Sequence, residues 1–343
     1  MKHALAVMLA LLVVGTVTYV TVKQRWEAPL SIAGDGMTVV VERGDSLAAI
    51  AYRLEQQGVL AHPQLLRWYG RATGLDQQVK RGEYFVPAGA TALALLEQLI
   101  VGEVVSYQVT LPEGITLRQA INILQQQDNL LSVLAGPEDP RLLAMVTPHA
   151  SAEGYFLPET YRYERGDSDL DVLTRARQAL GSVLDEAWSE RADGLPYETP
   201  YEALIMASII ERETGVPEER GEIAGVFVRR LHKGMLLQTD PTVIYGLGEG
   251  FDGNLRRTHL RDASNPYNTY RHGGLPPSPI ALPGAAAIHA ALHPEAGKSL
   301  FFVATGDGGH YFSETLAEHN KAVRKYQLKR VSDYRSSPRP KSQ

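Results

Sequence analysis

The apolar and polar positions of residues 199–214 form the most regular pattern in the chain and predict one buried helix. Thr199 and Glu202 have the spacing of a capping box, and Pro200 falls at the first helical position, where its missing N–H costs nothing. The apolar run that follows contains a single polar side chain, Ser208. This composition is expected of a helix that is covered on every side.

Glu211 comes directly after this apolar run. On a helix it shares a stripe with Leu204, Ala207 and Ser208, so its carboxyl group is expected to emerge from the apolar part of the helix. A carboxyl group in such a place resists ionisation. The alternative is a solvated residue of the last turn that pairs with Arg212 or a distant base.

Short strands that are followed by a glycine, a capping residue and a helix recur in the first half of the chain. Residues 38–42 read as a strand, and residues 44–58 read as a turn and an amphipathic helix that Gly58 closes. Similar sequences lead into helices within 86–100 and 111–124. We therefore expect an α+β fold, with a small αβ subdomain before a larger mixed α/β domain. Further elements are predicted as helices at 63–73, 168–192, 223–231, 284–292 and 314–328 and as strands at 300–304 and 310–312.

An uncharged, mostly apolar run covers residues 4–22 and is long enough to span a bilayer as a helix. Lys2 precedes the run, and Lys23 and Arg25 follow it. A cleaved signal peptide is the alternative, but the run is long for one, and residues 16–22 offer no cleavage site. We predict a single N-terminal transmembrane helix. Its flanking charges nearly balance, so they leave its orientation open.

Length and composition agree with a folded protein of two or three domains, since the chain has 343 residues of which 44% are hydrophobic. The net charge of −5 gives no signal for nucleic acid binding. Cysteine is absent, which excludes disulfides and thiolate metal sites. We predict an anchor with a short cytoplasmic end at 1–25, a linker at 26–37, a small subdomain at 38–104, a catalytic domain at 105–331 and a disordered tail at 332–343.

Three segments combine aromatic rings with short polar side chains. Residues 153–161 carry two carboxylates between aromatic residues, residues 238–242 form a Gln-Thr-Asp-Pro-Thr turn, and residues 267–270 read Tyr-Asn-Thr-Tyr. Such groups suit a sugar site, because rings stack on pyranose faces while polar ends bind hydroxyls. The alternatives are core packing for the first segment and, for the last, a proline-stiffened loop whose polar groups satisfy its own backbone.

Histidine does not point to a metal centre. His289 and His293 stand four residues apart on a predicted helix, but Ala290 follows His289 where a zinc protease has its glutamate. The chain has no Gly-x-Ser-x-Gly elbow and no phosphate-binding loop. We therefore expect no metal and no cofactor.

The segment 41–51, Val-Glu-Arg-Gly-Asp-Ser-Leu-Ala-Ala-Ile-Ala, resembles the first half of a LysM module. LysM modules bind the glycan of peptidoglycan or chitin, so the resemblance implies a LysM-like subdomain and a substrate in the cell wall. Turn and cap chemistry explains the same residues without any sugar.

Several longer blocks together resemble the endolytic murein transglycosylase family (MltG or YceG-like). They are Glu-Gly-Tyr-Phe-Leu-Pro-Glu-Thr-Tyr at 153–161, Ala-Ser-Ile-Ile-Glu-Arg-Glu-Thr at 207–214, Leu-Gln-Thr-Asp-Pro-Thr-Val-Ile-Tyr-Gly at 237–246 and Tyr-Asn-Thr-Tyr at 267–270. The resemblance implies a single-pass protein of the inner membrane whose catalytic domain faces the periplasm. It implies cleavage of the β-1,4 bond between N-acetylmuramic acid and N-acetylglucosamine in nascent strands, with a 1,6-anhydro end, and association with peptidoglycan synthases (penicillin-binding proteins).

The family's catalytic glutamate falls on Glu211. A lytic transglycosylase uses the sugar's own 6-hydroxyl as nucleophile, so one carboxyl group can first give a proton and then take one. We assign Asp240 a role in orienting substrate or charge and expect Glu213 to be solvated or structural. The predicted substrate-binding residues come from the polar and aromatic blocks: Glu153, Phe156, Gln238, Thr239, Asp240, Tyr245, Tyr267, Asn268, Thr269 and Tyr270.

Two other functions remain open at this point. A hydrolytic muramidase would use Asp240 as nucleophile or water activator and would leave a reducing end. A membrane scaffold for cell-wall synthases would bind peptidoglycan through the LysM-like segment without any catalysis.

Overall fold

The computed structural model describes residues 2–327, without the side chains of residues 2–7 and 10. The chain forms two compact units. The first consists of residues 1–107 and 162–167, and the second of residues 108–161 and 168–343. Residues 162–167 therefore belong to the first unit, although the sequence analysis placed them in the larger domain. The predicted tail at 332–343 lies outside the described residues.

The first unit contains a small sheet and three short helices after the long helix α1 (Lys2–Glu27). Strands β1 (Gly36–Val41) and β2 (Gly82–Pro87) pair antiparallel, with Thr38 opposite Phe85. The helices are α2 (Leu47–Gln56), α3 (Pro63–Thr73) and α4 (Ala92–Val101).

Predicted caps start two of these helices. The hydroxyl groups of Ser46 and Thr91 accept hydrogen bonds from the main-chain N–H groups of Ala49 and Ala94. These caps satisfy donors that the first helical turn leaves unpaired. The apolar faces of α2 and α4 then close over the sheet, and Ile50 and Leu95 are fully buried. The strand, turn and helix expected from residue 38 onward are confirmed.

None of the helices formed by the described residues has the length and apolar composition that spanning a membrane requires. The anchor predicted at residues 1–25 is therefore not confirmed. Part of the apolar run at 4–22 lies outside the described side chains.

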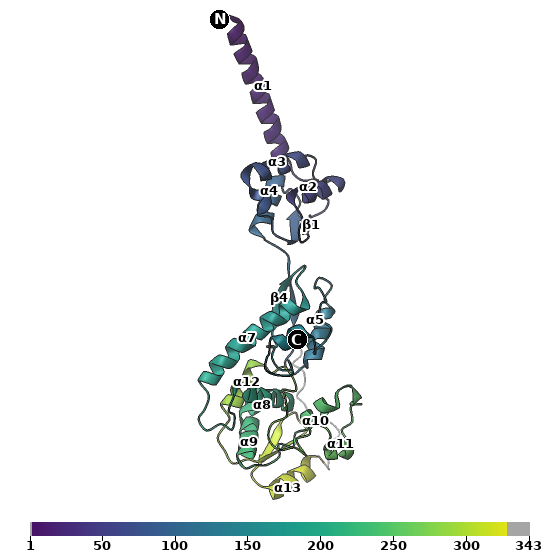
Figure 1. The fold of residues 1–343 in the computed structure, drawn as a ribbon, viewed down its shortest axis with the longest axis vertical. Helices are drawn as coiled ribbons and strands as arrows, with labels where there is room; N and C mark the ends of the chain where they lie inside the picture. The colour runs from purple at the N-terminus through teal and green to yellow at the C-terminus, as the bar shows by residue number, and fades with distance from the viewer. Residues whose placement is uncertain (1, 328–343) are drawn as a thin grey trace. The chain divides into compact units, whose positions relative to one another are not determined.

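The second unit is built around α8 (Pro200–Glu213), which packs against α7 (Asp169–Ser189), α9 (Arg220–His232), α10 (Asp240–Leu247) and α12 (Ala285–Leu292) (Figure 1). Both hydrogen bonds of the predicted capping box between Thr199 and Glu202 are present. Every residue from 203 to 210 is buried. The buried helix predicted from the apolar pattern is confirmed.

Shorter elements complete the second unit. Residues 301–304 and 310–313 form the antiparallel hairpin predicted near the C-terminal end, and β3 pairs with β4 in another two-stranded sheet. The bounds are β3 (Ser106–Thr110), α5 (Leu117–Gln125), α6 (Pro140–Ala144), β4 (Thr160–Glu164), α11 (Arg257–Arg261), β5 (Phe301–Ala304), β6 (His310–Ser313) and α13 (Leu316–Tyr326), with short 3-10 turns at Pro217–Glu219 and Gly248–Gly250. Strands β3 and β4 contain residues of both units, and a further 3-10 turn, Leu75–Gln77, belongs to the first unit. Helices thus accompany small two-stranded sheets, which agrees with the mixed α and β character that the sequence predicts.

The turn predicted at 238–242 is different in the structure. Only Gln238 and Thr239 lie outside a helix, and α10 begins at Asp240. Pro241 falls in the first helical turn, where it is tolerated because no N–H is needed there. This helix was not predicted, because an Asp-Pro pair is as typical of a turn as of a helix start.

Candidate active site

Glu211 stands in the last turn of α8, where the apolar run ends. Its side chain is only 5% exposed. The carboxyl group therefore emerges from the apolar part of the helix, as the helical stripe predicted, and the alternative of a solvated residue is wrong.

A cavity of about 340 Å³ opens at this end of α8. Its walls come from four places in the second unit that are far apart in sequence. They are residues 113–114, residues 211–215, Arg220 at the start of α9, and Gly308 with His310 in the last hairpin. Glu211 thus shares one cavity with two further carboxylates, Glu113 and Glu213.

Three neighbours act directly on Glu211. The main-chain N–H of Gly284 donates a hydrogen bond of 3.0 Å to Oε2 of Glu211. A guanidinium nitrogen of Arg220 lies 3.6 Å from Oε1, and the same nitrogen lies 3.7 Å from a carboxylate oxygen of Glu113. Burial raises the pKa of Glu211 and the charge of Glu113 raises it further, while the Gly284 bond and Arg220 lower it. The net direction is upward, which favours a protonated carboxyl group.

Glu113 reaches the cavity from the turn before α5. The turn is held by main-chain bonds to residue 282, from the N–H of Gly114 to Leu282 at 2.9 Å and from Leu282 to Ile115 at 2.8 Å. A Cβ atom at position 284 would lie 1.9 Å from Oε1 of Glu113, so glycine at this position leaves the space that the Glu113 carboxyl group occupies. Glu113 was not among the predicted site residues, because its Pro-Glu-Gly context is typical of a turn and its neighbours at the cavity come from distant segments.

Glu213 is partly buried and lines the same cavity, so of the two expected alternatives, a solvated or a structural residue, the burial favours the structural one. Burial raises its pKa to about 7, and the charge of Asp240 adds to that rise. The hydroxyl group of Thr239 donates to its carboxylate. Asp240 itself is exposed and accepts a hydrogen bond of 2.6 Å from the hydroxyl group of Tyr270.

Most of the predicted substrate-binding residues are engaged in holding the protein together. Asn268 is fully buried and donates to the carbonyl groups of His259 and Asp262 at 3.1 and 2.6 Å. The hydroxyl group of Thr269, also buried, lies 2.9 Å from that of Thr242 and accepts from the N–H of Thr239 at 3.0 Å. The Asn268 bonds fix the loop at 265–270 to the end of α11, and the Thr269 bonds fix it to the start of α10.

A second group of predicted residues surrounds a buried carboxyl group. Glu153 accepts from the N–H of Leu117 at 2.8 Å and from the hydroxyl group of Tyr245 at 3.2 Å. Burial raises the pKa of Glu153 to about 7. Tyr245 meets Tyr267 edge to face at 4.9 Å, and Phe156 is fully buried. Neither group lines the cavity beside Glu211. Gln238, the remaining predicted residue, is exposed and has a φ of 52°.

His310 was not among the predicted site residues, although it lines the cavity. The carboxylate of Glu219 accepts from the main-chain N–H of His310 at 2.8 Å and lies 2.7 Å from its Nδ1. The hydroxyl group of Thr214 donates to the same carboxylate at 3.3 Å. Glu219 therefore fixes both the backbone and the ring of His310 at the cavity wall. Within the described part of the chain, no cluster of three or more side chains could hold a metal ion.

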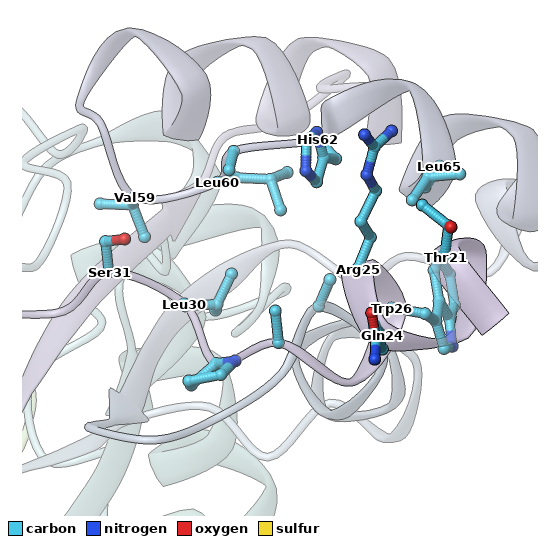
Figure 2. Close-up of a pocket in the computed structure, with 14 residues that line it drawn as sticks. Thr21, Gln24, Arg25, Trp26, Leu30, Ser31, Val59, Leu60, His62 and Leu65 are labelled. Atoms are coloured by element: carbon cyan, nitrogen blue, oxygen red, sulfur yellow. The ribbon is translucent and has the colours of Figure 1, made fainter.

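The first unit has a separate cavity of about 250 Å³, shown in Figure 2. It lies between the end of α1, residues 28–31 and the connection from α2 to α3. Arg25 extends across it toward His62, and the Trp26 ring packs on Tyr69 with centroids 4.8 Å apart. This cavity carries no carboxyl group, so it offers no group for acid catalysis.

Comparison with known proteins gives one consistent result. The model of the YceG-like family matches residues 39–325. An endolytic murein transglycosylase of Bacillus subtilis is 30% identical over 309 residues, which cover 84% of each protein. One of Streptococcus pneumoniae is 27% identical, and the match covers 84% of this chain and 58% of the relative. The crystal structure of a yceG-like protein from Listeria monocytogenes has 30% identity and a TM-score of 0.53, with 84% of this chain and 99% of that chain covered.

Proposed function

The chain belongs to the YceG-like family, and on that premise we propose that it is an endolytic murein transglycosylase with Glu211 as its acid and base. It cleaves the β-1,4 bond between N-acetylmuramic acid and N-acetylglucosamine inside glycan strands and leaves a 1,6-anhydro end. Cleavage within nascent strands would end their elongation.

The observation that supports the mechanism is that the neighbours of Glu211 have opposing effects on its pKa. Burial and Glu113 favour its neutral form, whereas the Gly284 N–H and Arg220 favour its charged form. A group that must give a proton and then take one needs both forms to be accessible. In the first step, neutral Glu211 transfers its proton to the glycosidic oxygen as the bond to C1 breaks.

In the second step, the 6-hydroxyl of the same sugar attacks C1, and the Glu211 carboxylate takes the hydroxyl proton. The product is a 1,6-anhydro ring, and Glu211 is neutral again. The hydroxyl is part of the reacting ring, and effective concentrations of such groups reach the order of 10⁵ M, so it can outcompete water. No second nucleophile on the protein is required.

The test uses purified sacculi and the variant Glu211→Gln, which keeps the shape of the side chain and removes its proton. Glu186→Gln on the exposed side of α7 is the matched control. We expect mass spectra to show anhydro ends with the wild type and the control, and no new ends with Glu211→Gln. Reducing ends from the wild type would overturn the transglycosylase assignment in favour of a muramidase. Strand shortening by Glu211→Gln at the normal rate would overturn the role of Glu211.

We also propose that the enzyme acts at the inner membrane, with its catalytic part in the periplasm and synthases as partners. The support is the family resemblance together with the apolar run at 4–22, in which Leu11, Leu12 and Val14 are exposed on α1. Cell fractionation with and without residues 1–25 tests the anchor. Equal recovery of both forms in the soluble fraction would contradict it.

A further inference from the structure

Two carboxylates share one arginine at the cavity beside Glu211. The nitrogen Nη2 of Arg220 lies 3.6 Å from Oε1 of Glu211 and 3.7 Å from Oε2 of Glu113. The two oxygens can therefore be no further apart than the sum of these two distances. Carboxyl pairs that act on one glycosidic bond stand about 5 to 9.5 Å apart, so this pair is close enough to face the same bond.

The two carboxylates differ sharply in their surroundings. Glu211 is 5% exposed and accepts the Gly284 N–H, whereas Glu113 is 48% exposed. No hydrogen bond from the described part of the chain reaches the Glu113 carboxylate, which pairs with Arg220 at 3.7 Å. The half-exposed Glu113 side chain forms part of the cavity wall, where a molecule in the cavity can contact it.

Arg220 is not saturated by this arrangement. Its side chain is 12% exposed, and its Nε is buried without a hydrogen-bond partner. Both carboxylate contacts are longer than the 2.7 to 2.9 Å of a charge-assisted hydrogen bond. The guanidinium group therefore contacts both carboxylates through one nitrogen, Nη2, and attracts them electrostatically.

We propose that Glu113 is a second catalytic carboxylate, which faces the reacting sugar and stabilises the positive charge that develops at C1 during bond cleavage. The inference rests on the proposed function of the site. Glu113 forms no bond to the sugar. The bond from C1 to the leaving oxygen breaks, that oxygen takes the Glu211 proton, O6 bonds to C1, and the O6 proton passes to Glu211. Glu113 supplies only a negative charge, which stabilises the positive charge of the oxocarbenium-like transition state.

The test compares Glu113→Gln with wild type, using the full chain and soluble glycan strands across a range of pH. Charge stabilisation of this kind contributes about 10²- to 10³-fold, so we expect kcat at the optimal pH to fall about 100-fold, with KM changed less than about 3-fold. The unfolding midpoint should change little, because Glu113 is half exposed, accepts no hydrogen bond and contacts Arg220 only at 3.7 Å. Glu113→Asp keeps the charge and should regain at least about 10-fold of the loss.

Glu113 and Arg220 are the charged groups that face Glu211. A Glu113 that only changed the pKa of Glu211 would therefore give a different result. In that case Glu113→Gln would shift the pH profile to lower pH and keep the maximal rate. That result, or an Asp variant no better than the Gln variant, would overturn the proposal. The ends formed by the wild type test the proposed function separately, because they do not depend on any Glu113 variant.

Discussion

The main-chain N–H of Gly284 donates a hydrogen bond of 3.0 Å to Oε2 of Glu211. Gly284 is the N-cap residue of α12, so the carboxyl group of α8 lies at the positive end of a neighbouring helix. The same glycine leaves the space that Glu113 occupies. One residue therefore orients the proposed acid and admits the second carboxylate.

Gly284→Ala should reduce activity strongly while it lowers the stability of the fold only slightly. The added methyl group would meet the far end of the Glu113 side chain, which can move away, and the φ of −72° suits alanine. We expect activity on sacculi to fall at least about 10-fold, with a stability cost of about 1 kcal/mol. Gly250→Ala, which meets nothing within 4 Å, is the control. Normal activity of Gly284→Ala would show that the displaced carboxylate has no role.

The pH dependence of the wild-type rate should report the protonation of Glu211. Its pKa is raised, so the rate should fall as pH rises through that raised value. Arg220 lowers this pKa, and Arg220→Gln should therefore move the falling limb to higher pH, even where the maximal rate is reduced. Arg71→Gln in the first unit is the control. A limb that stays in place or moves to lower pH in Arg220→Gln would contradict the assignment.

Glu153→Gln should change the pH dependence of stability. The folded pKa of Glu153 is about 7, above its unfolded value, so the folded state holds an extra proton between the two values. The contribution of Glu153 to the free energy of unfolding is therefore favourable at low pH and is lost as pH rises through about 7. The variant should gain up to about 3 kcal/mol relative to wild type between pH 5 and pH 8, as measured by urea unfolding. Parallel stability curves would contradict this.

Asn268→Ala decides between a binding and a structural role for the loop at 265–270. The side chain bonds the carbonyl groups of His259 and Asp262 and accepts from the N–H of Tyr270. Each buried group that loses its partner costs about 1 to 3 kcal/mol, so we expect a clear fall in the unfolding midpoint. Ser264→Ala, at an exposed site of the same region, should cost much less. A raised KM with an unchanged midpoint would instead support direct substrate binding.

The sequence by itself determined the local elements and the position of Glu211 on the buried stripe of its helix. The capping box at Thr199 and the uninterrupted apolar run define α8, and helical geometry places Glu211 on its buried stripe. These features depend on residues within a few positions of one another, so they can be inferred before folding is known. The motif blocks likewise identified the family that the comparisons confirm.

Only the tertiary structure decided what surrounds Glu211. Glu113, Arg220, Gly284 and His310 come from four separate segments, and no local pattern relates them. In the structure, Asn268, Thr269 and Glu153, which the sequence predicts to bind the sugar, lie in buried hydrogen-bond networks. Polar residues look the same in a sequence whether their partners are a substrate or the protein's own backbone, because the partner is chosen by packing between distant segments.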